Sequence, residues 1–150
     1  MQDLLMNDYV TDNKVVYVVL GKPIPLQRPR FGDNLVYDPQ KSVKKEVINE
    51  LLKQNKGRPT ICGMLHLHAD FHMQLPRAKS HKKHLLQQQY HVYKPDLSNL
   101  IKFIEDVCVD SRIIEDDCLI ASISSRKLYS DNPRTEFYFE TLRKETEYEE

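Results

Sequence analysis

The sequence predicts a small α+β domain, built on a mixed β-sheet with two principal helices, for three reasons. Its 150 residues are enough for one hydrophobic core, and no shift in composition marks a second domain. Two segments carry apolar residues at helical spacing, while four others are short and either β-branched or alternating. These segments follow one another as strand, helix, strand, helix, strand, strand, which is the pattern of an α+β domain.

The first half of the chain contains two of these strands, one helix and an extended loop. Residues 15–20 are rich in valine and predict a buried strand. Residues 22–30 include three prolines, which exclude a helix or a central strand and predict an extended loop. A helix is expected from Asp38, as the cap, to Gly57, because apolar residues form one stripe along it. Residues 61–71 alternate between apolar and polar, which predicts a half-buried strand.

The second half predicts the remaining helix and two further strands. Residues 79–89 are polar and basic, and either a short helix or an ordered loop fits them. A second long helix is expected to start near Asp96, where apolar residues begin to recur at helical spacing. Residues 119–128 and 135–142 predict strands joined by a turn. The domain core is expected to span about residues 15–139, before an acidic and frayed tail at 140–150.

Charge is balanced overall but unevenly distributed. The formal net charge is zero, which by itself argues against bulk electrostatic binding of DNA. Residues 21–134 nevertheless carry 19 basic and 13 acidic residues, and residues 77–95 contain no acid. An acidic run follows at 105–117. A basic strip beside carboxylates suits a site that holds a polyanion and a divalent cation. On charge alone, a patchy solvated surface is the simpler interpretation.

Several protein classes are excluded by what the sequence lacks. No apolar run approaches the roughly 20 residues that a membrane helix needs. The N-terminus lacks the basic and apolar regions of a secretory signal, so we expect a cytoplasmic protein that does not contact membranes. The three cysteines form no CxxC pair, which favours free thiols over disulfides or a zinc site.

The candidate chemistry lies in one acidic segment around the second helix. Asp96 is expected at the helix start, and Asn99, Lys102 and Asp106 on one face of it. Asp116–Asp117 follows a loop and is expected at the start of a strand. Oxygen ligands of this kind suit Mg²⁺ or Mn²⁺ rather than zinc. Two alternatives stay open, because Asp96 could be a plain helix cap and Asp106 could pair with Lys102.

The residues of this segment resemble a known signature. The run KPDLSNLIK, followed by ED and EDD, resembles the signature of the RusA family of Holliday-junction resolvases. Residues 21–31, GKPIPLQRPRF, are similar to the basic N-terminal loop of that family, and the resemblance extends from about Val15 to Phe139. It implies a RusA-like fold and a homodimeric, Mg²⁺-dependent endonuclease that cuts four-way DNA junctions symmetrically. Mn²⁺ would be a possible substitute, and no nucleotide cofactor is expected.

The resemblance also assigns roles to residues. Asp96 and Asp117 match the metal-binding aspartates, Asp116 is the partner of the closing pair, and Lys102 matches an essential lysine. Asp96, Lys102 and Asp117 are therefore the expected catalytic residues. The residues expected to contact DNA are Arg28, Arg30, Lys82, Lys83, Lys94 and Asn99.

One position departs from the family pattern. Ser98 stands where the family has its second metal-binding aspartate, so the site loses one negative charge. Serine can still bind Mg²⁺ weakly or through water, and Asp106 or Glu115 could compensate. Two alternatives to a junction resolvase follow: a catalytically weak or inactive dimer that only binds junctions, and a Mg²⁺ nuclease that acts on flaps or single strands.

Overall fold

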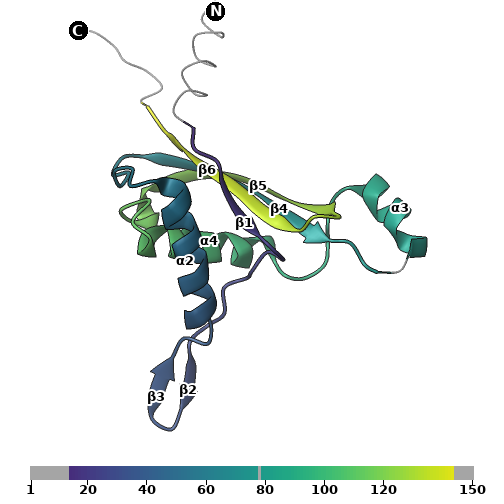
Figure 1. The fold of residues 1–150 in the computed structure, drawn as a ribbon, viewed down its shortest axis with the longest axis horizontal. Helices are drawn as coiled ribbons and strands as arrows, with labels where there is room; N and C mark the ends of the chain where they lie inside the picture. The colour runs from purple at the N-terminus through teal and green to yellow at the C-terminus, as the bar shows by residue number, and fades with distance from the viewer. Residues whose placement is uncertain (1–13, 78, 144–150) are drawn as a thin grey trace, which may run out of the picture.

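The computed structural model describes residues 14–77 and 79–143. Its centre is a four-stranded mixed sheet with the strand order β1-β6-β4-β5, and helices α2 and α4 lie on one face of it (Figure 1). The predicted α+β class with a mixed sheet is therefore confirmed. The strands are β1 (Tyr17–Leu20), β4 (Leu65–Gln74), β5 (Ile120–Ser130) and β6 (Arg134–Thr141).

Strand β4 forms the centre of the core. Every second side chain, from Leu65 to Met73, is buried, whereas the residues between them are half-buried. This is the alternation that the sequence predicts, although the strand starts at Leu65 and not at Ile61. Ile61 instead forms an isolated bridge with Ile114. Two strands that are distant in sequence flank β4, because β6 pairs with it antiparallel and β5 parallel.

The two last strands do not pair with each other. β5 and β6 are joined by the short turn that the sequence predicts, yet β4 lies between them in the sheet. β6 therefore crosses to the far side of β4, where β1 pairs with its other edge. β6 reaches Thr141, so the first residues of the predicted frayed tail belong to a strand. The rest of that tail, residues 144–150, lies outside the described residues.

The two principal helices pack their apolar stripes on the sheet. α2 (Lys41–Asn55) buries Val47 and Leu51, and α4 (Leu97–Asp110) buries five residues: Leu100, Phe103, Ile104, Val107 and Cys108. The N-cap of α2 is Gln40 and not Asp38 as predicted, because the side chain of Asp38 accepts a hydrogen bond from the Gln40 N–H in a turn before the helix. The helix ends where Lys56 and Gly57 adopt the left-handed conformation, as the glycine predicts.

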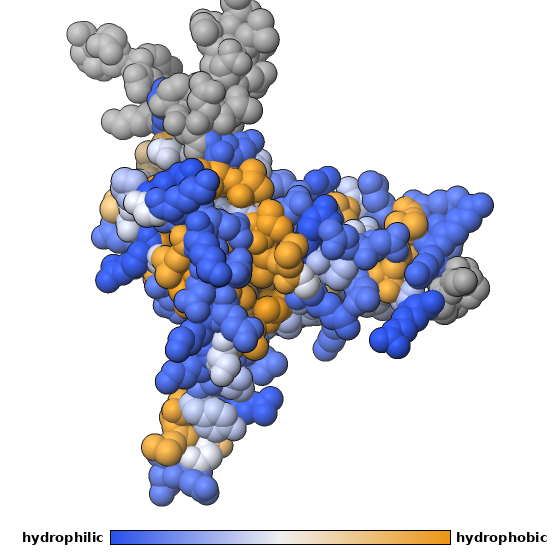
Figure 2. Space-filling view, viewed as in Figure 1, coloured by the Kyte–Doolittle hydropathy of each residue, from blue (hydrophilic) through white to orange (hydrophobic). Residues whose placement is uncertain are grey.

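Two smaller elements project from this body in different directions (Figure 1). β2 (Arg30–Gly32) and β3 (Leu35–Tyr37) form a hairpin that the sequence does not predict; its turn residues Asp33 and Asn34 both have positive φ, as a tight hairpin turn requires. Apolar side chains on the hairpin are exposed (Figure 2), with Phe31 84% accessible. α3 (Lys79–Gln88) confirms the short helix that was one of two expectations for this stretch.

The other face of the sheet carries a polar ladder along β4 and β5. His66 and His68 bond with the hydroxyls of Ser122 and Ser124 at 2.6–3.0 Å, and His68 also bonds with Asp70 at 3.0 Å. The histidines that a metal-binding interpretation would use therefore have serine and aspartate partners. No helix among the described residues is long and apolar enough to cross a membrane.

Candidate active site

Long-range hydrogen bonds hold the segment that leads into α4. The Lys127 ammonium on β5 donates to the carbonyl oxygens of Tyr93, at 2.6 Å, and Pro95, at 2.8 Å. From the proline-rich loop, the Leu26 N–H donates to the Asn99 carbonyl at 3.0 Å. The start of α4 is thus tied to the sheet on one side and to the proline-rich loop on the other. Lys127 carries no signal in the sequence, because a lysine on a strand looks like any solvent-facing residue.

Asp96 is the N-cap residue of α4, as predicted. Its backbone is extended, and its carbonyl accepts the hydrogen bond from the Leu100 N–H that starts the helix. Its carboxylate, however, makes no capping hydrogen bond and is exposed. Asp96 therefore occupies the cap position, but its side chain does not supply a capping hydrogen bond. The carboxylate lies beside the positive end of the helix dipole, where a further ligand could reach it.

The outer side of α4 presents the other signature residues. Ser98 and Lys102 are exposed and Asn99 is half-buried, while the apolar residues of the helix face the core. One turn further, Glu105 and Asp106 are half-buried. The predicted arrangement of one polar face is therefore confirmed, and it runs from the helix start to its third turn.

Asp106 does not pair with Lys102 as that alternative proposed. Its carboxylate lies 3.2 Å from the ammonium of Lys44 on α2, which also bonds with Asp38 at 2.7 Å. Burial alone would lower the pKa of Lys44, but its hydrogen bonds to the two aspartates outweigh burial and raise that pKa. Asp106 therefore forms part of an ionic link between α2 and α4, a role that sequence spacing cannot show.

Asp117 begins a 3₁₀ turn, η1 (Asp117–Leu119), directly before β5, and Asp116 is the N-cap residue of that turn. The Asp116 carboxylate accepts the backbone N–H of Cys118 at 3.1 Å, and this bond lowers its pKa. Asp117 has a raised pKa, chiefly through its hydrogen bond with Asp116, with further repulsion from Asp116 and Asp106. Two adjacent carboxylates that resist joint ionisation favour a cation between or beside them.

Glu105 belongs to the acidic run of the sequence, but sequence reasoning assigned it no role. Its pKa is raised by burial and by the negative charges of Asp117 and Asp106, against a smaller opposing effect of Lys102. Glu105 therefore lies within electrostatic reach of the closing aspartate pair, which nothing in its sequence position indicates. Glu115, one of the residues expected to compensate for Ser98, is instead hydrogen-bonded to Cys62 and raises the pKa of that thiol.

The predicted DNA-contacting cations come from separate segments. Arg28 precedes β2 and Arg30 begins it, so both lie at the base of the projecting hairpin, and both are exposed. Lys82 and Lys83 lie on α3, the other projection, and exposed Lys94 directly precedes the Pro95–Asp96 entry to α4. The hairpin, α3 and the start of α4 thus each carry positive charge (Figure 1).

The donor chemistry of this region fits Mg²⁺. Asp96, Asp116 and Asp117 offer only carboxylate oxygens, and the mutual repulsion at the aspartate pair is what a divalent cation relieves. Within residues 14–77 and 79–143, however, no three His, Cys, Asp or Glu side chains are grouped closely enough to hold a metal ion. Mg²⁺ often keeps several waters and binds through one or two carboxylates together with substrate phosphates. The aspartate pair therefore offers oxygen donors of the kind that Mg²⁺ binds.

Comparison with known proteins identifies the family of this chain. The family model described as Endodeoxyribonuclease RusA matches residues 21–138, which include the proline-rich loop, α4 and the aspartate pair. The uncharacterized protein YqaN of Bacillus subtilis (strain 168) is 25% identical over 132 residues, covering 81% of this chain and 92% of that relative. Since the family match covers most of the chain, the protein is a nuclease that belongs to the RusA family of Holliday-junction-resolving endodeoxyribonucleases.

Proposed function

We propose that the protein is a Mg²⁺-dependent homodimeric endonuclease that binds four-way DNA junctions and cuts two opposed strands symmetrically. The observation that carries this proposal is the Asp96 carboxylate, which is exposed and makes no capping bond at the mouth of α4. The same helix presents Lys102, and the loop that positions Asp96 is held by Lys127. A two-fold dimer would present two such sites to the two-fold symmetry of a junction.

In the proposed mechanism, Asp96 and Asp117 would hold the metal, Asp116 would assist Asp117, and Ser98 would be a weak or water-mediated ligand. When bound, Mg²⁺ supplies Lewis-acid stabilisation and lowers the pKa of water. Mn²⁺ would substitute, because it accepts the same oxygen ligands. Asp116 positions Asp117, because its own carboxylate is anchored by the Cys118 N–H.

Lys102 acts on the scissile phosphate. Its ammonium would stabilise the negative charge that grows on the phosphoryl oxygens in the transition state, which is where a positioned cation accelerates a reaction. The positive end of the α4 dipole adds to this effect near Asp96. Lys102 is exposed, so a DNA backbone can approach it without rearrangement of the core.

The cations outside the site bind the junction arms. Exposed Arg28 and Arg30 at the hairpin base, together with Lys82 and Lys83 on α3, would contact phosphates of different arms, with Lys94 and Asn99 nearer the cut. Contacts of this kind position the duplex but do not read its sequence. They would also give the steep salt dependence that counterion release produces.

A second candidate function is a junction-binding dimer with little or no catalysis. It is favoured by Ser98 and by the absence, among the described residues, of a three-ligand acidic cluster. The variant Ser98→Asp separates the two. If wild type binds but does not cut and Ser98→Asp cuts, the natural protein is a binder; equal cutting by both shows that serine is tolerated.

The deciding experiment compares an end-labelled four-way junction with linear duplex, a flap and a single strand, in Mg²⁺ and in EDTA. We expect paired symmetric nicks in the junction alone, only with Mg²⁺, on a denaturing gel. Size-exclusion chromatography with light scattering is expected to give a dimer. Preferred cutting of the flap or the single strand would show that the protein is a nuclease for those substrates and not a junction resolvase. A junction that is shifted on a native gel but not cut would support the junction-binding dimer.

A further inference from the structure

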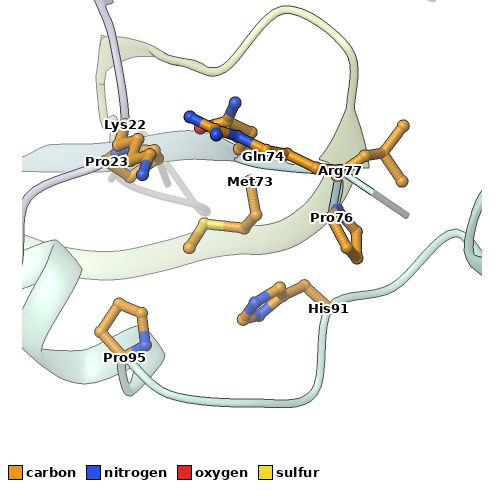
Figure 3. A pocket seen from close by; sticks show the side chains of 9 residues that line it. Lys22, Pro23, Met73, Gln74, Pro76, Arg77, His91 and Pro95 are labelled. Atoms are coloured by element: carbon orange, nitrogen blue, oxygen red, sulfur yellow. The ribbon is translucent and has the colours of Figure 1, made fainter. Parts of the chain in front are cut away.

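An open cavity lies beside the segment that leads into α4, and none of the proposed catalytic residues lines it. Its volume is about 400 Å³, and it is lined by the end of β4, the loop after β1 and the segment before α4. Pro95 lines it, and Asp96 is the next residue in the chain. Figure 3 shows Lys22 and Pro23 on one side, Pro76 and His91 on the other, and Met73 between them.

The interior of this cavity suits a flat, partly apolar group. Met73 and Leu75 are buried at its floor, and Pro23 and Pro95 add apolar ring surfaces. The imidazole of His91 points into the space between Met73 and Pro95 (Figure 3). Aromatic bases stack on imidazole and apolar surfaces of this kind whatever their sequence.

His91 also offers an unused hydrogen-bonding atom. Its Nδ1 is buried and has no partner among the described residues, although such atoms are normally satisfied. The ring is held in place, because the His91 N–H donates to the Lys127 carbonyl at 2.9 Å and Tyr129 packs at 5.1 Å between ring centroids. Burial and the charge of Lys127 lower the pKa of His91, which favours the neutral form of the ring. A neutral imidazole nitrogen can bond with the edge of a base.

The remaining wall of the cavity is cationic. Lys22 and Arg77 are exposed and line it, and no acidic residue does. Gln74, the last residue of β4, supplies an amide. The cavity therefore combines an apolar floor, one unpaired ring nitrogen and two cations. A nucleotide has the matching parts, namely a flat base with polar edges and a phosphate.

We propose that this cavity receives one unstacked nucleotide of the DNA strand at the branch point, with its base over Met73 and His91 and its phosphate beside Lys22 and Arg77. The inference rests on the proposed function, because it requires a bound junction. The volume of the cavity lies in the range of ligand-binding cavities, about 300–1,000 Å³. Unstacking a nucleotide costs least where pairing is already interrupted, as it is at the crossover. The occupant would thereby fix which phosphate reaches Asp96.

The test uses junctions with a single 5-iododeoxyuridine at successive positions around the crossover, bound to the full-length protein in EDTA. Each complex is irradiated, and the cross-linked residue is identified by mass spectrometry, while a native gel measures binding. We expect one position, on two opposed strands, to cross-link to Met73 or His91. Bound junctions that cross-link only elsewhere would overturn the inference and leave the proposed function standing. A junction that does not bind at all would overturn both.

Two variants and a matched control sharpen this test. Gln74→Trp fills the cavity from an exposed position and is expected to reduce the cross-link about tenfold, with affinity on the native gel within about threefold of wild type. Arg77→Gln removes only a cation and is expected to reduce the yield of the cross-link several-fold. Gln87→Trp, exposed on α3, should change neither. An undiminished cross-link in both cavity variants, each with wild-type melting behaviour, would contradict the assignment.

Free 5-iododeoxyuridine monophosphate distinguishes a nucleotide within DNA from a free one. We expect it not to be captured at Met73 or His91 at concentrations at which the junction is. Capture of the free monophosphate there, without capture from the bound junction, would refute the assignment to the DNA strand.

Discussion

The substitution Lys127→Met tests whether β5 positions the proposed catalytic aspartate. It keeps a long apolar side chain and removes only the ammonium, which bridges the carbonyls of Tyr93 and Pro95. Both carbonyls lie within three residues of Asp96, so their release lets the entry to α4 move. The lysine lies outside the acidic face, and no role in metal binding or proton transfer is assigned to it.

The expected loss of stability follows from the two hydrogen bonds. A hydrogen bond to a charged group contributes about 1.5–3 kcal/mol when it is well shielded. The bond to Tyr93 is exposed and contributes much less to the free energy of unfolding, while the bond to Pro95 is partly buried. A loss of about 2 kcal/mol in the free energy of unfolding corresponds to a fall in Tm of about 4–8 °C for a chain of this size. Displacement of Asp96 by about 1 Å would lower kcat roughly 100-fold.

Thermal unfolding followed by circular dichroism measures the fall in Tm. Single-turnover junction cleavage at saturating Mg²⁺ measures the fall in the cleavage rate. The control is Lys45→Met, which removes a charge from an exposed position on α2. It should leave Tm and the cleavage rate unchanged. If Lys127→Met lowered Tm as expected but cut junctions at the wild-type rate, the bridge would stabilise the fold without positioning Asp96, and the reasoning would be refuted.

Three further predictions concern the site, the DNA and the sheet. Asp117→Asn should abolish cleavage but preserve the native-gel shift; loss of the shift would make Asp117 structural. Combined replacement of Arg28 and Arg30 by alanine should reduce the slope of log affinity against log salt by about 2, since each phosphate contact contributes roughly 0.9; an unchanged slope would remove the hairpin base from the DNA interface. Burial would raise the pKa of Asp70, but hydrogen bonds from Arg126 and His68 lower it, so its stabilisation holds above about pH 4 and disappears as pH falls through the lowered pKa. Asp70→Asn should therefore be less stable than wild type at pH 7, but should lose less stability on acidification; parallel acid curves would contradict this.

Local sequence patterns were sufficient to predict the elements that depend on residues close together in the chain. The alternation along β4 and the helical spacing after Asp96 reflect which side chains face the core, and each is set by residues close in the chain. The family signature is local for the same reason, because Asp96, Ser98 and Lys102 lie close together in the chain at the start of α4, and all three are exposed. The class of fold and the candidate catalytic helix were therefore predictable.

The tertiary structure decided which distant residues meet. Local sequence does not indicate that β4 lies between β5 and β6 in the sheet. It also does not indicate that Asp106 forms an ion pair with Lys44 instead of Lys102, or that the negative charge of Asp117 raises the pKa of Glu105. The hairpin was also missed, because its exposed apolar residues bury nothing in the described part of the chain and so leave no core pattern to read. The role of Lys127 was missed as well, because its hydrogen-bond partners lie more than 30 residues away in the sequence. Such contacts depend on packing between elements, and a single chain's periodicity carries no information about it.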